Sequence, residues 1–294
     1  MRLAKRELKE RGAGMSWSKA KNIIILVLLA ANLLLAAVAL PIHRRQVRED
    51  DRLIRELDTL FSAQGLSLST DLLPGQKVLY ELELTHGSDA ASAAVTALLG
   101  DSVLMQTDSG RYLSVYTGPN GSCTFSHTGG FSARLTGVQA ASDDLLADAA
   151  QRLEAMGFVC ESLRDLGTDA DGFRRIQAQQ SLLGSPIFGT GLTLCYRGRT
   201  LESMDGMFYA LDGLPVQASE TACISAADAL VAFLAGRNDL GWVGSQITAI
   251  QQGWLETETP SALLSRLTPA WRITTDTAVL YVSGLDGSLT QPPQ

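Results

Sequence analysis

Residue types that carry catalysis in proteins occur in this sequence only as short, isolated patterns. Ser16-Trp17-Ser18-Lys19 has the Ser-x-x-Lys spacing in which a lysine activates a serine nucleophile at the head of a buried helix. Here the pattern directly precedes a long apolar run, where no pocket can surround the serine. We therefore interpret Lys19 and Lys21 as cations at a membrane interface, and Trp17 as an aromatic residue at the same interface.

Patterns for metal and nucleotide binding are incomplete. Asp169-Ala170-Asp171-Gly172 resembles part of a calcium loop, but the register places Gly167 at the first ligand position and Ala178 at the bidentate acid. The segment is more typical of a turn. Gly189-Thr190-Gly191 lacks a third glycine at the spacing of a nucleotide loop, and it precedes a strand-like run rather than a helix. The sequence therefore predicts no cofactor.

Acid–base chemistry would have to use carboxylates, because the histidines have no spacing that is typical of metal ligands. Glu81 and Glu83 would share one face of a strand, since side chains two residues apart point the same way. A solvated strand face explains this pair without catalysis. We expect that the chain is not an enzyme; its three histidines are His43, His86 and His127.

The four cysteines lie far apart and include no Cys-x-x-Cys pair, which argues against a zinc ribbon or a redox motif. Outside the membrane they could form disulfides in any of three pairings. Isolated cysteines in strand-like apolar runs are also often buried thiols, and this is the interpretation that we favour for Cys123, Cys160, Cys195 and Cys223.

The apolar run from Ile23 to Ile42 is the first element that must position the rest of the chain. At about 1.5 Å per residue it reaches about 30 Å, which is one bilayer crossing. The alternative is a cleaved export signal, for which Ala37-Val38-Ala39 is the only suitable site. We predict a retained transmembrane helix, in which the amide of Asn32 can bond another membrane helix.

The distribution of basic residues favours an N-terminus inside the cell. Residues 1–22 hold seven basic and two acidic residues, a net charge of +5, and seven cations precede the run whereas five follow it. The rest of the chain must then carry −12 to give the total of −7. An acidic body outside the cell suits neither nucleic acid nor anionic lipid.

After the membrane segment, residues 43–65 predict an amphipathic stalk helix. Val47, Ile54, Leu57 and Phe61 recur at helical spacing among dense charges, and Gly65 is a suitable C-terminal stop. The apolar stripe could pair with a second helix, but packing onto its own domain is the commoner use and the one that we favour.

The remaining residues alternate between helical and strand-like patterns. Segments 88–100, 142–157 and 225–236 each open with serine and close with glycine, as capped helices do. Strands are predicted at 77–85, 111–118, 173–180, 191–198 and 207–211. The prediction is an α+β body with antiparallel meanders, in two lobes at 66–140 and 141–294, with a weaker boundary inside the second lobe near residue 220.

Both ends of the chain resemble one family. Trp17-Ser18-Lys19-Ala20-Lys21 followed by Asn32-Leu33-Leu34-Leu35 resembles the opening of YycI proteins, and the C-terminal part resembles their closing strands. Residues 1–14 extend ahead of the usual family start, so that Met15 is an alternative initiator, and Trp254-Leu255 stands where paired tyrosines are expected. The C-terminal residues that carry the resemblance are Ile247-Thr248-Ala249-Ile250, Gly253-Trp254, Leu267-Thr268-Pro269-Ala270-Trp271-Arg272-Ile273, Leu280-Tyr281-Val282 and Gly284.

This resemblance implies a single-pass regulator of the WalK (YycG) sensor histidine kinase in a Gram-positive two-component system for cell-wall homeostasis. It implies two partners, a sensor kinase of the WalK type and a YycH-type regulator, with membrane contacts through Trp17, Lys19, Lys21 and Asn32. In the closing strands, alternation predicts that Trp271 packs inward and that Arg272 faces solvent or a carboxylate. The alternative function is an anchored or secreted extracellular module that binds a peptide or a glycan.

Overall fold

In the computed structural model the chain is described at residues 28, 53, 56–69, 73–75, 77–85, 87–101, 103–108, 113–257 and 264–290. It forms two compact units, Met1–Glu56 and Leu57–Gln294. The predicted basic tail, and all of the predicted span except Leu28, lie outside the described residues, as does most of the stalk before residue 56. Within the described part of the chain, no helix is long and apolar enough to cross a membrane.

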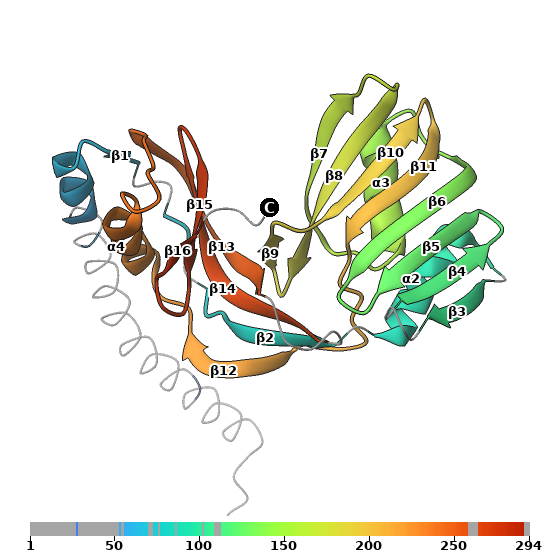
Figure 1. Cartoon of the computed structure of the whole chain (residues 1–294), viewed down its shortest axis with the longest axis horizontal. Coiled ribbons are helices and arrows are strands. Elements are labelled where there is room, and N and C mark those ends of the chain that lie inside the picture. The colour runs from blue at the N-terminus through green and yellow to red at the C-terminus, as the bar shows by residue number, and fades with distance from the viewer. Residues whose placement is uncertain are drawn as a thin grey trace, which may run out of the picture. The chain divides into compact units, whose positions relative to one another are not determined.

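The second unit is an α+β body built on one mixed, mostly antiparallel sheet of sixteen strands in the described residues (Figure 1). Two strand pairs there are parallel, β1 with β13 and β9 with β13. The prediction of an α+β body with antiparallel meanders is confirmed. The main path through the sheet runs β12-β2-β14-β13-β9-β8-β10-β11-β6-β5-β4-β3.

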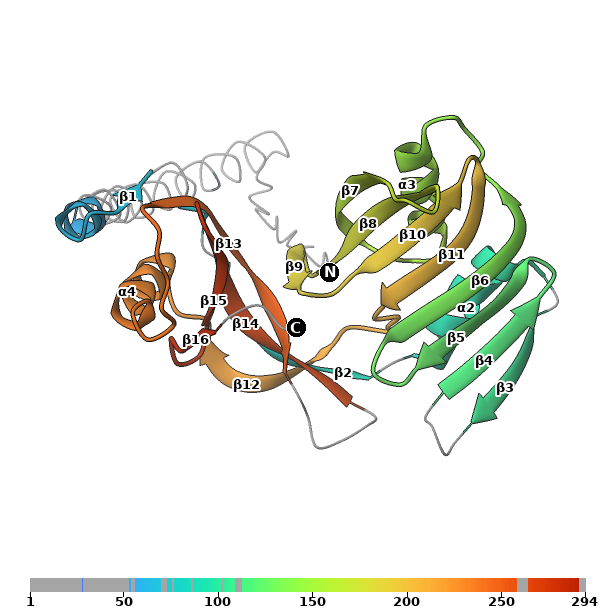
Figure 2. The same cartoon turned by 45° about the horizontal axis from the view of Figure 1, so that its top comes forward.

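One part of this sheet, which we call the meander lobe, carries two helices on the same face (Figures 1 and 2). Its core contains residues from both sides of the expected boundary at 140, since Val138 and Leu145 belong to the same hydrophobic cluster. The lobe consists of α2 (Ser88–Leu99), β3 (Leu104–Asp108), β4 (Leu113–Gly118), β5 (Gly121–Ser126), β6 (Gly130–Gln139), α3 (Leu145–Ala155), β7 (Cys160–Thr168), β8 (Phe173–Leu182), β10 (Leu192–Arg197) and β11 (Thr200–Met207).

The other part, which we call the terminal lobe, is built from both ends of the second unit. Strands from residues 67–85 lie beside strands from residues 216–290, and α4 packs on this sheet. The strand β9 (Ser185–Phe188) joins the two parts, because it pairs with β8 and with β13. The lobe consists of residues 57–63, which are helical, β1 (Ser67–Leu68), β2 (Tyr80–Thr85), β12 (Val216–Ala222), α4 (Ala226–Gly236), β13 (Gln246–Thr257), β14 (Leu264–Thr275), β15 (Val279–Ser283) and β16 (Leu289–Thr290).

The described end of the predicted stalk packs onto its own domain. Leu57 and Phe61 are buried in the core of the terminal lobe, and the ring of Phe61 stacks on Phe233 of α4 at a centroid distance of 6.4 Å. Gly65 ends the helix in the left-handed region, at a φ of 71°, as predicted. For these residues the favoured use of the apolar stripe is confirmed.

The three predicted helices are present, but only one has the predicted serine cap. Ser225 begins α4 in a capping box with Asp228. Asp144, rather than Ser142, caps α3 by accepting from the amides of Leu146 and Ala147. For α2 the cap comes from a distant segment, since a carboxylate oxygen of Asp212 accepts from the amide of Ala90 at 2.6 Å.

The strand predicted at 207–211 is wrong. The strand β11 ends at Met207, and Phe208, Tyr209 and Ala210 follow as a buried segment outside any ladder. Their apolar character reflects burial, because Phe208 packs between the rings of Phe125 and Phe158 at centroid distances of 5.6 and 5.4 Å. A short apolar run alone does not distinguish such a buried connection from a strand.

Candidate functional site

The C-terminal residues that carry the family resemblance meet on three adjacent strands. Gly253 of β13 lies opposite Ala270 of β14, and Trp254 lies opposite Pro269. In the next pair of strands, Arg272 of β14 lies opposite Tyr281 of β15. Residues that are spread along the last part of the sequence therefore form one continuous patch of sheet, which Figure 2 shows as β13, β14 and β15.

One face of this patch is closed by two tryptophans. Trp254 and Trp271 are 1% and 0% exposed and lie in the core of the terminal lobe. Each indole N–H has a backbone acceptor, Trp254 at the carbonyl of Tyr80 (3.2 Å) and Trp271 at the carbonyl of Ile224 (3.0 Å). A buried indole N–H needs such a partner. The predicted inward packing of Trp271 is confirmed.

The opposite face holds a cluster of Phe188, Gln251, Arg272 and Tyr281, which we call the arginine–aromatic cluster. The guanidinium of Arg272 lies 4.9 Å from the ring centroid of Phe188 and donates to the Gln251 side-chain oxygen. The ring of Tyr281 lies 5.5 Å from that of Phe188. Among the described residues no carboxylate forms an ion pair with Arg272, whose side chain is half-buried and lies over the aromatic ring that β9 supplies.

The contacts of the arginine–aromatic cluster hold neighbouring strands together. Burial raises the pKa of Tyr281, and the neighbouring Arg272 opposes this rise only in part. The phenol therefore stays protonated at neutral pH. Because Phe188 belongs to β9 and Arg272 to β14, their contact fixes β9 against the C-terminal strands.

Gly253 allows this close approach of β9. A Cβ atom at position 253 would lie 2.3 Å from the carbonyl oxygen of Pro186 and 2.7 Å from the ring of Phe188. Both neighbours belong to β9, and one is backbone, so that no side-chain rotation relieves the clash. The glycine in the family-like sequence is therefore explained by packing.

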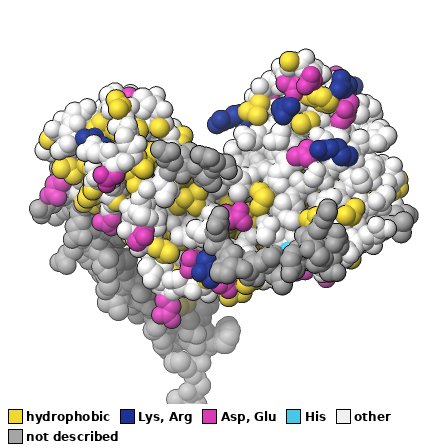
Figure 3. Space-filling view, in the orientation of Figure 1, with side chains coloured by type: hydrophobic (Ala, Val, Ile, Leu, Met, Phe, Trp, Pro, Cys, Tyr) yellow, Lys and Arg dark blue, Asp and Glu magenta, His cyan; other side chains and the backbone are white. Residues whose placement is uncertain are grey.

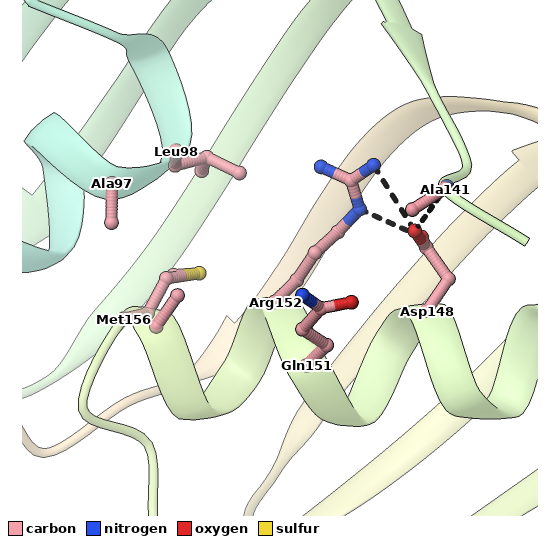
Figure 4. Close-up of a pocket in the computed structure, with 8 residues that line it drawn as sticks. Ala97, Leu98, Ala141, Asp148, Gln151, Arg152 and Met156 are labelled. Carbon is pink, nitrogen blue, oxygen red and sulfur yellow. Dashed lines mark hydrogen bonds and ion pairs between the residues drawn. The ribbon is translucent and has the colours of Figure 1, made fainter.

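A second cluster lies in the meander lobe, where sequence patterns had not pointed to it. The carboxylate of Asp148 is 2% exposed and accepts four hydrogen bonds from three residues, of which Figure 4 shows those from Arg152 and Ala141. Arg152 donates from Nε at 2.7 Å and from Nη2 at 3.2 Å, the amide of Ala141 at 2.8 Å, and the hydroxyl of Tyr196 at 2.8 Å. The only sequence signal was the i, i+4 spacing of Asp148 and Arg152 on α3.

These donors decide what Asp148 can do. Burial acts to raise its pKa, but the hydrogen bonds from Arg152, Ala141 and Tyr196 outweigh burial, and the pKa is lowered overall. A carboxylate whose lone pairs are filled by fixed donors is a poor general base, and a lowered pKa excludes a general acid at neutral pH. Asp148 and Arg152 also line a hollow of about 200 Å³ between α2 and α3, in which Asp148 is held by these fixed donors.

The other candidates of the sequence are occupied by local contacts. Glu83 forms an ion pair with Arg266 at 2.7 Å, and Glu81 accepts from Thr268, so that the pair on β2 is only partly solvated. Asp169 closes the predicted turn by accepting from the amides of Asp171 and Phe173. In the described part of the chain, no group of three or more His, Cys, Asp or Glu side chains could hold a metal ion.

All four cysteines are free thiols, but the expected burial holds for only two of them, because Cys160 and Cys195 are half-buried. Cys123 and Cys223 are buried, and burial raises the pKa of Cys123 to about 12. Basic and acidic side chains lie near one another on parts of the meander lobe (Figure 3), and ion pairs there include Arg174 with Asp165 and Arg197 with Glu202. Most exposed arginines of this lobe are thus already paired with acids of the same lobe.

The predicted membrane contacts Trp17, Lys19, Lys21 and Asn32 lie outside the described residues. They stay predictions, whereas the structure brings Gly253, Trp254, Pro269, Trp271, Arg272 and Tyr281 together as described above. Comparison of the whole sequence with protein-family models and with curated proteins gives no match.

Proposed function

We propose that this chain is a membrane-anchored accessory regulator of a two-component sensor histidine kinase, acting through protein contacts in cell-wall homeostasis. In this proposal a single transmembrane helix holds the N-terminus in the cytoplasm and the α+β body outside the cell. The partners are a WalK-type kinase and a YycH-type regulator. No enzyme activity, cofactor or nucleic acid is involved.

The observation that carries the proposal is the joining of the family-like segments on β13, β14 and β15. Several of these residues occupy positions where their type matters. Gly253 leaves room for β9, and the indole of Trp271 reaches the carbonyl of Ile224, whereas Trp254 stands where the family has a tyrosine. A resemblance in residues that the fold requires is more informative than one in surface residues, because chance matches do not select for packing.

The membrane part of the proposal rests on Asn32. An amide in hydrocarbon bonds a neighbouring helix with roughly 0.6–2 kcal/mol, which corresponds to about a 3- to 30-fold change in association. We expect that Asn32→Leu weakens association with the kinase by this factor and leaves insertion intact. Ala30→Leu, which adds the same side chain two residues earlier, is the matched control. Equal association of both variants with the kinase would argue against a role for the amide.

The direct test is crosslinking of the tagged full-length protein in its native membranes, followed by identification of the crosslinked partners by mass spectrometry. We expect to recover a sensor histidine kinase and a second single-pass regulator. Their reproducible absence, under conditions in which another known membrane complex of the same cells is recovered, would contradict the proposal.

An exchange of the span separates this proposal from an anchored binding module. Residues 23–42 are replaced by an unrelated transmembrane helix of the same length, and kinase output is measured with a reporter gene. The proposal predicts that output changes as it does in the deletion strain. Wild-type output after the exchange would instead favour the body as the active part, as expected for a module that binds a peptide or a glycan.

A further inference from the structure

The strand β12 leaves its partner over part of its length. Val216 and Gln217 pair with Glu83 and Leu82 of β2, but the next registered pair is Ala222 with Tyr80. Residues 218–221 therefore have no registered partner on β2, because the pairs on either side of them, Gln217–Leu82 and Ala222–Tyr80, are only two residues apart on β2. β12 is also the last strand on its side of the sheet (Figures 1 and 2), and no strand among the described residues pairs with its outer edge.

A cavity of about 310 Å³ lies beside this departure, and we call it the bulge pocket. Its walls are mainly apolar, and they include Val78, Leu79, Leu82, Leu214, Pro215 and Trp254. The indole of Trp254 is held by its hydrogen bond to Tyr80, so that this wall is rigid. The pocket is therefore a preformed hollow of the size of one or two side chains, at the lower limit of ligand cavities.

Large apolar side chains surround the opening of the bulge pocket. Leu214 is 84% exposed, Val78 67% and Leu183 56%. Single exposed apolar residues need no explanation, but several around one cavity mark an interaction surface.

Leu183 adds an independent observation. It forms the two-residue turn between β8 and β9 with Gly184, and its φ is +50°, the only positive φ outside glycine in the described residues. Such turns prefer asparagine or glycine, because a bulky side chain there costs roughly 1–2 kcal/mol. Lys77 holds the turn by donating to the Gly184 carbonyl and to the Ser185 hydroxyl. Neither backbone preference nor burial accounts for a leucine at this position.

The net charge of the body indicates which kind of partner this surface attracts. Of the 24 basic and 31 acidic residues, 12 and 6 lie in residues 1–56, so that residues 57–294 carry 12 and 25 and a formal net charge of −13. Seven of the arginines that the structure describes in this range are in ion pairs. β12 itself has no basic residue and exposes Glu220. Pairing of β12 with a second copy would bring like charges together, whereas a basic strand would be attracted.

We propose that the bulge pocket and the outer edge of β12 bind an extended, basic segment of a partner protein by strand addition. One apolar side chain of that segment enters the bulge pocket between Leu214 and Leu183, and a basic side chain lies opposite Glu220. Main-chain hydrogen bonds to β12 supply affinity, and the pocket supplies selectivity. This inference rests on the proposed function, because it assigns the surface through which the body meets a partner.

The test uses the full-length protein in lipid nanodiscs and the fluorescent heptapeptide Lys-Val-Lys-Leu-Lys-Val-Lys as the probe. Binding is measured by fluorescence anisotropy. We expect that Leu214→Asn weakens binding about tenfold, as truncation of an interface anchor does. The control is Val243→Asn, because Val243 is 83% exposed and does not line the pocket. Likewise, Glu220→Lys should weaken binding more than Glu154→Lys, which changes an exposed acid on α3.

Several outcomes would overturn the inference. These are the absence of binding, equal affinity of Leu214→Asn and Val243→Asn, and equal affinity for a heptapeptide with proline in place of its central leucine, which cannot pair as a strand. A dimer in sedimentation that is lost in Leu214→Asn would assign the surface to a second copy. Binding of the body to protein-free anionic vesicles that is lost in the same variant would assign it to lipid.

A second measurement separates this inference from the proposed function. The kinase is co-purified with wild type, Leu214→Asn and Val243→Asn. If the kinase binds all three equally and the peptide test fails, the inference is overturned and the proposed function stands. If the kinase binds none but the peptide test succeeds, the proposed function fails and the strand-binding surface is supported.

Discussion

Replacement of Gly253 by alanine is the most direct test of how the C-terminal strands are held together. The added methyl group would lie 2.3 Å from the Pro186 carbonyl oxygen and 2.7 Å from the Phe188 ring. Real Cβ atoms do not approach other atoms so closely, so that β9 must move away from β13. That movement would loosen the pairs Trp254–Ile187 and Leu255–Phe188 and the stacking of Arg272 on Phe188.

The size of the effect follows from these contacts. Overpacking of a well-packed site costs about 1–3 kcal/mol, and the neighbour that must move here is backbone, so we expect about 2–3 kcal/mol. For a domain of this size each kcal/mol lowers Tm by roughly 2–4 °C, which gives a decrease of roughly 5–10 °C. Gly213→Ala is the matched control, because no atom lies within 4 Å of its added methyl group. Its effect should be neutral or slightly stabilising.

Thermal unfolding of the purified full-length protein is followed by near-ultraviolet circular dichroism, which reports on the packing of buried tryptophans. Hydrogen exchange of residues 185–188 provides a local measurement, and it should be faster in Gly253→Ala and unchanged in Gly213→Ala. If both variants unfold within about 1 °C of wild type, the close approach of β9 is not the reason for glycine at position 253, and the explanation of this site is wrong.

Three further predictions concern other sites. Asp148→Asn should lower the free energy of unfolding by about 2–4 kcal/mol at neutral pH, because it removes one partner of a buried ion pair. Since the folded pKa of Asp148 is lowered, its contribution is present above the unfolded pKa of about 3.9 and is lost as the pH falls through the folded pKa. Urea unfolding should therefore differ between the two proteins at pH 7 and converge in strong acid; a constant difference at all pH values would contradict this. Asp212→Ala should destabilise the meander lobe by about 1 kcal/mol, whereas Ser88→Ala should be neutral because Ser88 does not cap α2. Denaturant midpoints measure both effects, and a larger decrease for Ser88→Ala than for Asp212→Ala would contradict the assignment of the cap. Cys123, which is buried with a pKa of about 12, should react with iodoacetamide at pH 8 only after unfolding, whereas the less buried Cys160 should react first; labelling of Cys123 in the folded protein, read by mass spectrometry, would refute its burial.

Local signals predicted those elements whose stabilising contacts are local. Ser225 was predicted to cap α4, and it does so, in a capping box with Asp228 three residues further on. The alternation of residues along β14 likewise correctly predicted that Trp271 points inward. The same reasoning failed at α2, because its cap is Asp212, which comes from a segment far along the chain.

The candidate site was predictable as a set of residues but not as an arrangement. The family-like segments identified β13, β14 and β15, yet nothing in Ser185-Pro186-Ile187-Phe188 indicated a four-residue strand that would run between two lobes. Arg272 was expected to meet solvent or a carboxylate; its side chain is partly exposed, and it also lies over the ring of Phe188, which the sequence did not predict. The burial of Asp148 was equally hidden, since Tyr196 and Ala141 reach it only after the sheet has formed.

The terminal lobe draws its strands from the beginning and the end of the second unit, and this constrains how the chain can be made. Leu82 of β2 pairs with Leu267 of β14, so that β2 has no sheet partner on that side until nearly the whole polypeptide has been synthesised. The meander lobe lies between them in the sequence and can fold while the ribosome is still extending the chain. Closing so long a loop is slow. We therefore expect folding in two stages, in which the C-terminal strands complete the sheet last, and a nascent chain that ends before β14 keeps β2 exposed to chaperones and proteases.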